Sequence, residues 1–202
     1  MVTIGHAHLA EVGLARFSGR EVAKRAGYSV GTISNVFGSV DGLIVAINSR
    51  SFEHWADLLR ERLSCGQDDR IAALVSGYFA FAERQPELWS AIYAHRLPEG
   101  MDLSDEDRER RAGLTRIVED EIRAVLPEEC DTDVIRLARS LVAVVHGHCS
   151  FVVSGSFALL EEPDPQGAAL ARVRESLTAH GYRSTQDAPD FGQDAGENGM
   201  FS

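Results

Sequence analysis

The chain contains 202 residues, of which 44% are hydrophobic, and it carries a formal net charge of −11 at pH 7. This length and apolar content allow one large domain or two small ones, each with a real core. No stretch approaches the ~18 unbroken apolar residues of a membrane span, and no basic-then-apolar signal opens the chain, so we expect no membrane contact. Three cysteines without paired spacing fit a reducing compartment, and we expect a cytoplasmic protein.

Charge is distributed unevenly along the sequence. Residues 1–50 hold five basic and three acidic side chains, so this segment is weakly basic and the remainder is strongly acidic. A basic head on an acidic body can bind DNA through the head, because the phosphates repel the body. The head is only mildly basic, and we therefore expect its non-specific affinity for DNA to be low.

The first part of the chain predicts three short helices, at residues 2–12, 18–26 and 29–37. Ser18 is expected to cap the second helix, with Glu21 closing a capping box. Gly27 stands where a helix needs a left-handed C-terminal turn. Ser29 and Ser39 are expected to cap the third helix and the longer helix that follows it.

The second and third helices have the spacing of a helix-turn-helix. Ala23 is small enough for a second helix to cross close above it, Gly27 supplies the turn, and Ile33 lies inside the second helix. Val30, Ile33 and Phe37 are predicted to form the buried side of that helix. A helix-turn-helix places its second helix in the major groove of DNA.

This block resembles the TetR-type bacterial transcriptional regulators. The residues that carry the resemblance are Glu21-Val22-Ala23, Ala26-Gly27, Ser29, Gly31-Thr32-Ile33, Phe37, Ser39 and Leu43. The resemblance implies an all-α regulator in which a homodimer binds a palindromic operator in double-stranded DNA. Further along, Val145-His146-Gly147 is similar to a Trp-x-x-x-His-Gly element of one group of TetR C-terminal domains, with Val142 in the place of the tryptophan.

The residues expected to contact DNA lie on or shortly before the second helix of the motif: Arg16, Arg20, Lys24, Ser29, Gly31, Thr32, Ser34 and Asn35. Gly31 lets the backbone approach a phosphate, and Thr32 can bond a phosphate or touch a thymine methyl group. Asn35 can pair with adenine through two hydrogen bonds. The alternative is that these side chains are simply solvated.

Three positions depart from the TetR pattern. Ser34 and Val36 stand where the family usually has aromatic phosphate-contacting residues, and Val40 stands where it usually has a lysine. Each lost contact weakens the salt-dependent part of DNA binding. One alternative is therefore a degenerate family member that binds a ligand but no longer binds DNA.

The rest of the chain predicts helices at residues 40–63, 68–84, 86–97, 104–126, 132–154 and 165–181. The fold class is thus all-α, with a three-helix helix-turn-helix domain followed by a larger helical domain. We expect residues 1–47 to bind DNA and residues 48–183 to bind an effector and dimerise. Residues 184–202 have little to bury and are predicted to be disordered.

A small-molecule pocket is predicted from aromatic and polar residues of three helices: Tyr78, Phe79, Trp89, Tyr93, His146, Cys149 and Phe151. A mostly apolar cavity with a few polar groups is typical of such a site. The alternative is an aromatic stripe that belongs to the plain core. An apolar lining favours a hydrophobic effector, and the acidic body disfavours anions. No cofactor is expected.

Metal binding and catalysis are the alternative hypotheses for the His146–Cys149 segment. His146 and His148 are two positions apart, so on a helix they point to nearly opposite sides and cannot share one metal ion. A helical enzyme using His146 and Cys149 would lack an acid–base set, and an apolar helix should raise the pKa of the thiol. We expect neither a metal site nor an enzyme.

A homodimer is predicted through the last two long helices, which would form a four-helix face with their copies. The residues expected at this interface are Leu137, Leu141, Val144, Leu170, Val173 and Leu177. They offer more apolar surface than one small domain needs to cover.

Overall fold

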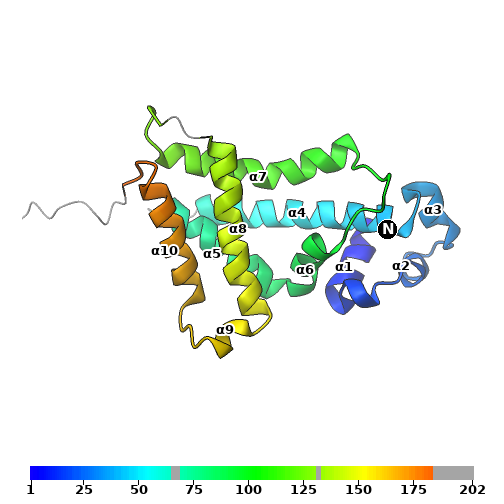
Figure 1. Ribbon diagram of the computed structural model, residues 1–202. Helices are drawn as coiled ribbons and strands as arrows, with labels where there is room; N and C mark the ends of the chain where they lie inside the picture. Colours follow the sequence, from blue (N-terminus) through cyan, green and yellow to red (C-terminus); the bar gives the residue numbers. More distant parts are fainter. Residues whose placement is uncertain (65–68, 131–132, 184–202) are drawn as a thin grey trace, which may run out of the picture.

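The computed structural model describes residues 1–64, 69–130 and 133–183, and every regular element within them is a helix (Figure 1). The predicted tail from Ser184 lies outside the described residues. The N-terminal helices are α1 (Val2–Val12), the 3-10 helix η1 (Leu14–Arg16), α2 (Gly19–Arg25), α3 (Gly31–Phe37) and α4 (Val40–Ser64). The later helices are α5 (Arg70–Arg84), α6 (Pro86–Ala94), α7 (Asp105–Val125), α8 (Val134–Val153), α9 (Ser156–Leu159) and α10 (Pro165–Thr178).

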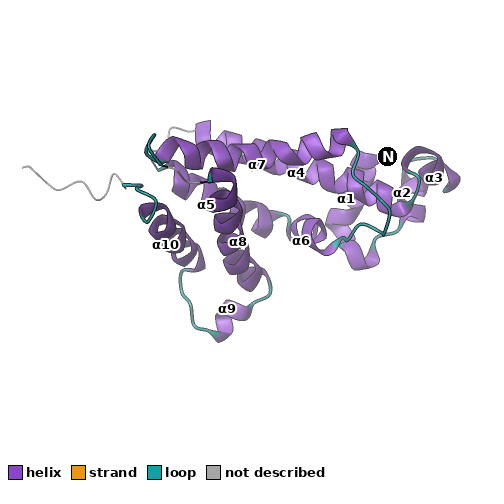
Figure 2. Cartoon of the chain, turned by 45° about the horizontal axis from the view of Figure 1, so that its top comes forward, coloured by secondary structure: helices purple, strands orange, loops and turns teal. Residues whose placement is uncertain are grey.

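Helix α4 runs along much of the molecule and joins its two ends. Helices α1, α2 and α3 gather around its N-terminal end, and α7 lies alongside it (Figures 1 and 2). At the other end, α8 and α10 pack side by side, both contact α5, and α8 also packs against α7. We call residues 1–47 the head and the rest of the described chain the body. No helix of the described residues is long and apolar enough to cross a bilayer.

The head and the body have separate hydrophobic cores. The head core contains Leu9, Val22, Ala23, Ile33, Leu43, Ile47, Leu88 and Ala91. The last two residues belong to α6, whereas its Trp89 is buried in the body core. Helix α6 therefore packs into both cores from opposite faces.

The helix-turn-helix forms as its sequence predicts. The Ser18 hydroxyl accepts the Glu21 N–H at 3.3 Å and caps α2, but the Glu21 carboxylate pairs with Arg25 instead of closing the predicted capping box. Gly27 has φ 76°, the left-handed conformation that favours glycine. Ala23 and Ile33 are buried at 0% and 1% exposure, as the motif requires.

Two details of α3 correct the predictions. The side chain of Ser29 does not cap the helix, because its hydroxyl lies 3.2 Å from the Thr32 hydroxyl and α3 begins only at Gly31. Val30 is the N-cap residue and is 48% exposed, although it was predicted to be buried. The later start turns Val30 away from the head core, and Phe37 packs against that core half-buried.

Helices α8 and α10 use their apolar faces within the chain. Leu137, Leu141, Val173 and Leu177, which were predicted at a dimer interface, are each less than 9% exposed and belong to the body core. They are buried against the chain's own helices and are unavailable to a partner. Val144 and Leu170 are half-buried. The sequence also missed α9, because four residues are too few to show a helical period.

Candidate functional site

The outer face of α3 presents a cluster of small and polar side chains. Gly31, Ser34 and Asn35 are exposed, Ser29 precedes them in the exposed turn, and Thr32 is half-buried. These predicted DNA-binding residues therefore lie together on one face of the head. Their contact with DNA stays a prediction.

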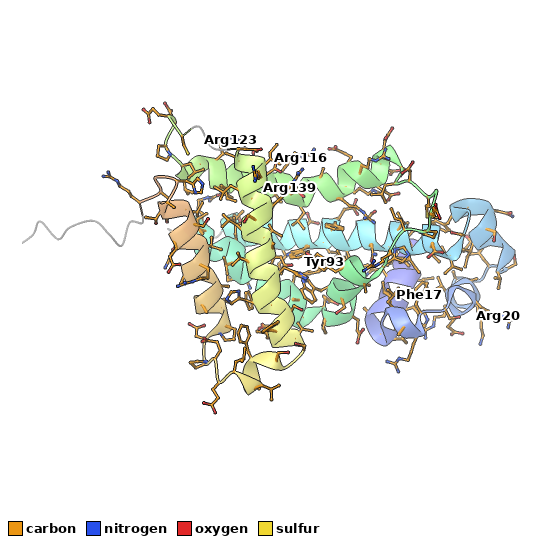
Figure 3. The ribbon with its side chains drawn as sticks, in the orientation of Figure 1. Phe17, Arg20, Tyr93, Arg116, Arg123 and Arg139 are labelled. Atoms are coloured by element: carbon orange, nitrogen blue, oxygen red, sulfur yellow. The ribbon has the colours of Figure 1, made fainter. Side chains whose placement is uncertain are left out.

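The predicted basic residues lie around this face. Arg20 and Lys24 are exposed on α2, and neither makes a hydrogen bond or ion pair within the described part of the chain. Figure 3 places Arg20 at the outer edge of the head. Arg16 differs, because its Nε donates to the Val12 carbonyl at 3.0 Å and so holds the guanidinium near the end of α1.

Tyr28 is a candidate contact that the sequence analysis missed. Its backbone N–H donates to the Ala23 carbonyl at 2.9 Å and fixes the turn, while the residue is 58% exposed. Val36 and Val40 are also exposed, at 64% and 42%. An aromatic residue directly after the turn glycine was the available signal for Tyr28.

The body contains a partly open cavity of about 370 Å³ between α4, α5, α6, α7, α8 and α10. Its lining consists of Phe52, Trp55, Leu59, Ile71, Leu74, Val75, Tyr78, Tyr93, Leu114, Thr115, Val118, Ile122, Ala138, Arg139, Leu141, Val142, Val145 and Val173. Two of the predicted pocket residues, Tyr78 and Tyr93, are in this lining. The volume falls within the usual range for small-molecule sites.

A polar aromatic cluster borders the cavity at Tyr78 and Tyr93. The Tyr78 hydroxyl lies 2.9 Å from the Tyr93 hydroxyl and 2.9 Å from Nδ1 of His146. The Trp89 ring stacks on His146, with the ring centroids 5.0 Å apart. Trp89 and His146 thus belong to the predicted constellation but support the cavity from behind its lining.

Burial keeps this cluster uncharged. It raises the pKa of both Tyr78 and Tyr93 and lowers the pKa of His146. In the tautomer that carries its proton on Nε2, the neutral imidazole accepts a hydrogen bond from the Tyr78 hydroxyl at Nδ1, while Tyr78 accepts one from Tyr93. The hydroxyl of Tyr93 then offers oxygen lone pairs toward a ligand, and no charge.

Three predicted pocket residues lie elsewhere. Phe79 is buried in the body core and Cys149 is 0% exposed, but neither is in the cavity lining. Phe151 is 45% exposed and packs against Phe157. Successive helix positions turn by about 100°, so neighbours of lining residues face other directions.

His146, His148 and Cys149 of α8 have different surroundings. Burial raises the pKa of the Cys149 thiol to about 12, as expected, so the thiol stays protonated at neutral pH. The His148 Nδ1 lies 2.9 Å from its own helix carbonyl at Val144, whereas His146 faces Tyr78. Within the described residues no group of three potential metal ligands comes together.

The cavity and the head are joined through α6. Tyr93 lines the cavity, and Leu88 and Ala91 lie in the head core. The Asn48 side-chain amide donates to the Ala91 carbonyl at 3.3 Å. Further along, Nε2 of His95 lies 3.1 Å from Oδ1 of Asp41 in the first turn of α4.

Two parts of the chain match known protein families. Residues 5–47 match the bacterial regulatory proteins of the tetR family, and residues 71–176, more than half of the chain, match the tetracyclin repressor-like C-terminal domain. The chain belongs to the TetR family. It is thus a TetR-like transcription regulator with a helix-turn-helix DNA-binding part and a helical ligand-binding part. No curated relative matches the sequence.

Solved structures share this TetR fold. A Rhodococcus sp. RHA1 protein of unknown function aligns with a TM-score of 0.67 at 20% identity, over 89% of this chain and 92% of that one. A putative tetR family regulator from Shewanella sp. PV-4 gives 0.63 at 14% identity, over 87% and 94%. The multidrug binding protein EbrR complexed with imidazole gives 0.57 at 22%, over 92% and 96%.

Proposed function

We propose that this TetR-family protein is a repressor that binds a palindromic operator as a homodimer and is released by a small hydrophobic effector. The observation that carries the proposal is the double role of α6. Its Tyr93 lines the cavity, and its Leu88 and Ala91 are part of the head core. A ligand that displaces Tyr93 therefore moves an element on which the head rests.

The release step is a shift between two populations of head positions. An effector that binds better to one position of α6 favours that position by its difference in affinity. In a two-fold dimer, both heads must match successive major grooves, so a change in their spacing weakens operator binding. The similarity to EbrR, which is described as a multidrug binding protein, supports a ligand role for the cavity.

The proposed dimer uses the outward faces of α8 and α10. Ala143, Gly147 and Phe151 are exposed on α8, and a Cβ added at Gly147 would meet nothing within 4 Å. Ile135 and Val153 are exposed on the same helix, at 43% and 39%. Small and apolar residues on one helix face favour close packing against a second copy.

DNA selected from a random pool by the wild-type protein tests the function. We expect a gel shift with an enriched palindrome, and its loss when a hydrophobic effector is added. Val36→Glu places a negative charge on the exposed face of α3 and should weaken binding about tenfold or more through phosphate repulsion. A wild-type protein that binds ligands but enriches no DNA supports the degenerate alternative instead.

A further inference from the structure

The lining of the cavity includes a charged side chain. Among the described residues that line the cavity, Arg139 on α8 is the only one with a charged side chain. The residue is exposed overall and also borders the cavity, so it lies at the edge where the cavity meets solvent. Its neighbours in the lining include Ala138 and Val142, which are apolar.

Arg139 also differs from the arginines near it. Figure 3 shows Arg116 and Arg123 of α7 around the place where α8 crosses that helix. Each is paired, with Arg116 2.5 Å from Glu109 and Arg123 2.8 Å from Asp120. Within the described residues, Arg139 has no hydrogen bond or ion pair.

The two tyrosines of the lining carry no charge. The Tyr78 hydroxyl lies within hydrogen-bond distance of both Tyr93 and His146, in a cluster that burial holds neutral. A cationic ligand would therefore meet an arginine and no carboxylate in the lining.

We propose that the effector is an apolar monocarboxylate whose hydrocarbon part fills the cavity and whose carboxylate pairs with Arg139. The inference rests on the proposed role of the cavity as the effector site. A guanidinium matches a carboxylate with two parallel hydrogen bonds, and a partly desolvated pair is stronger than one in open water. The apolar walls from α4, α5 and α7 accept the rest of the molecule.

The rival explanation is an arginine that covers apolar surface with its stem and keeps its head in water. Such a residue would not distinguish an acid from an alcohol. Ligand charge, varied at constant hydrocarbon shape, therefore separates the two explanations.

Calorimetric titration with two matched sets of probes makes this comparison. One set is dodecanoate, dodecanol and dodecyltrimethylammonium; the other is naphthoate, naphthalenemethanol and naphthylmethyl-trimethylammonium. In the better-fitting set we expect the acid to bind about tenfold or more tightly than the alcohol, and the ammonium compound to bind most weakly.

The variants assign the preference to one side chain. Arg139→Gln should remove the advantage of the acid and leave alcohol binding unchanged, and Arg139→Lys should keep part of it. Arg136→Gln is the matched control, because Arg136 is exposed on the same helix and outside the cavity lining. This control should bind all probes as the wild type does.

Equal binding of acid and alcohol, an acid preference that survives in Arg139→Gln, or no binding of any probe would overturn the proposal. Gel shifts with the selected DNA report the regulatory function separately. Acids that bind through Arg139 without any DNA shift would uphold this inference and reject the proposed repressor. Release from DNA by the alcohols alone would do the reverse.

Discussion

At the scale of single residues, the head combines a well-formed motif with few charged contacts. Asn35 is exposed on α3, where it can reach base edges, whereas Ser34, Val36 and Val40 supply no charge around it. We therefore expect the specificity of the head to depend on short polar side chains. We expect its overall affinity to depend on a small number of phosphate contacts.

Asn35→Ala should relax base preference at one operator position. A side chain that pairs with adenine through two hydrogen bonds contributes ~1–3 kcal/mol of discrimination. Binding to operators changed one base pair at a time measures this. An equal loss of affinity across all sequences would show that Asn35 contacts phosphate instead.

Val40→Lys should tighten binding to every sequence and steepen its dependence on salt. Val40 is 42% exposed at the start of α4, beside Gly19, so a lysine stem can occupy its place with the ammonium in solvent. One added phosphate contact raises the slope of log affinity against log salt by about 0.9. Titrations at several salt concentrations check this, and an unchanged slope would place the phosphates elsewhere.

At the scale of elements, α6 is the short helix on which both cores depend. The helix begins with a proline at its first position and has Glu87 in its first turn. At its C-terminal end, the backbone of His95 is extended. This explains why the helix ends at Ala94 and not near residue 97. The extended His95 then meets Asp41 of α4.

Trp89→Ala should destabilise the protein by ~3–5 kcal/mol, because the indole is 5% exposed and stacks on His146. Urea unfolding measures this cost. Tyr93→Phe is the control on the same helix, since it removes a single hydroxyl and should cost far less. A loss below about 1 kcal/mol for Trp89→Ala would mean that the site collapses around the smaller side chain.

At the scale of the whole molecule, assembly and acid stability both follow from how helices cover one another. The inner residues of α8 and α10 are used within the chain, which leaves their outer faces for a partner. At the other end of the body, His6 of α1 meets His54 of α4 with ring centroids 4.9 Å apart. The outer faces of α8 and α10 are where we expect a dimer to form. The contact between His6 and His54 is part of the packing of the head on the body.

Phe151→Glu should convert the proposed dimer to a monomer, because it places a charge on the exposed face of α8. Light scattering at micromolar concentration gives the mass. Val36→Glu makes a comparable change on the head and should remain dimeric. Leu177→Glu is not a suitable test, since Leu177 is 0% exposed and its loss would unfold the body. A monomeric wild type would rule out the dimer.

Acid should loosen the contact between α1 and α4. Burial, followed by the charges of His54 and Arg50, lowers the pKa of His6 from 6.5 to about 4. The unfolded chain thus takes up this proton first, so the free energy of unfolding should fall from pH 6.5 down to about 4 and then level off.

His6 is half-buried in the folded chain, which limits this loss to ~1–2 kcal/mol. Unfolding curves of wild type and His6→Gln across this pH range isolate the contribution of His6 to the free energy of unfolding, because the other groups are the same in both proteins. Parallel pH profiles for the two proteins would contradict the assignment.

The sequence by itself determined the helices and the motif. Caps at Ser18 and Ser39, the turn at Gly27 and the periodic apolar residues are local signals, and local signals fix where helices begin and end. The same patterns identified the TetR resemblance that the family match confirms. The predicted helix ends agree with the structure within a few residues.

Only the tertiary structure decided which neighbour each apolar face meets. Leu141 and Val173 line the cavity in place of a dimer interface, and Phe151 faces solvent, because periodicity marks a face without naming its partner. Arg139 looked like an ordinary surface residue in the sequence. It became a candidate contact only when α7 and α8 brought apolar walls around it, since a cavity is formed by residues far apart in the chain.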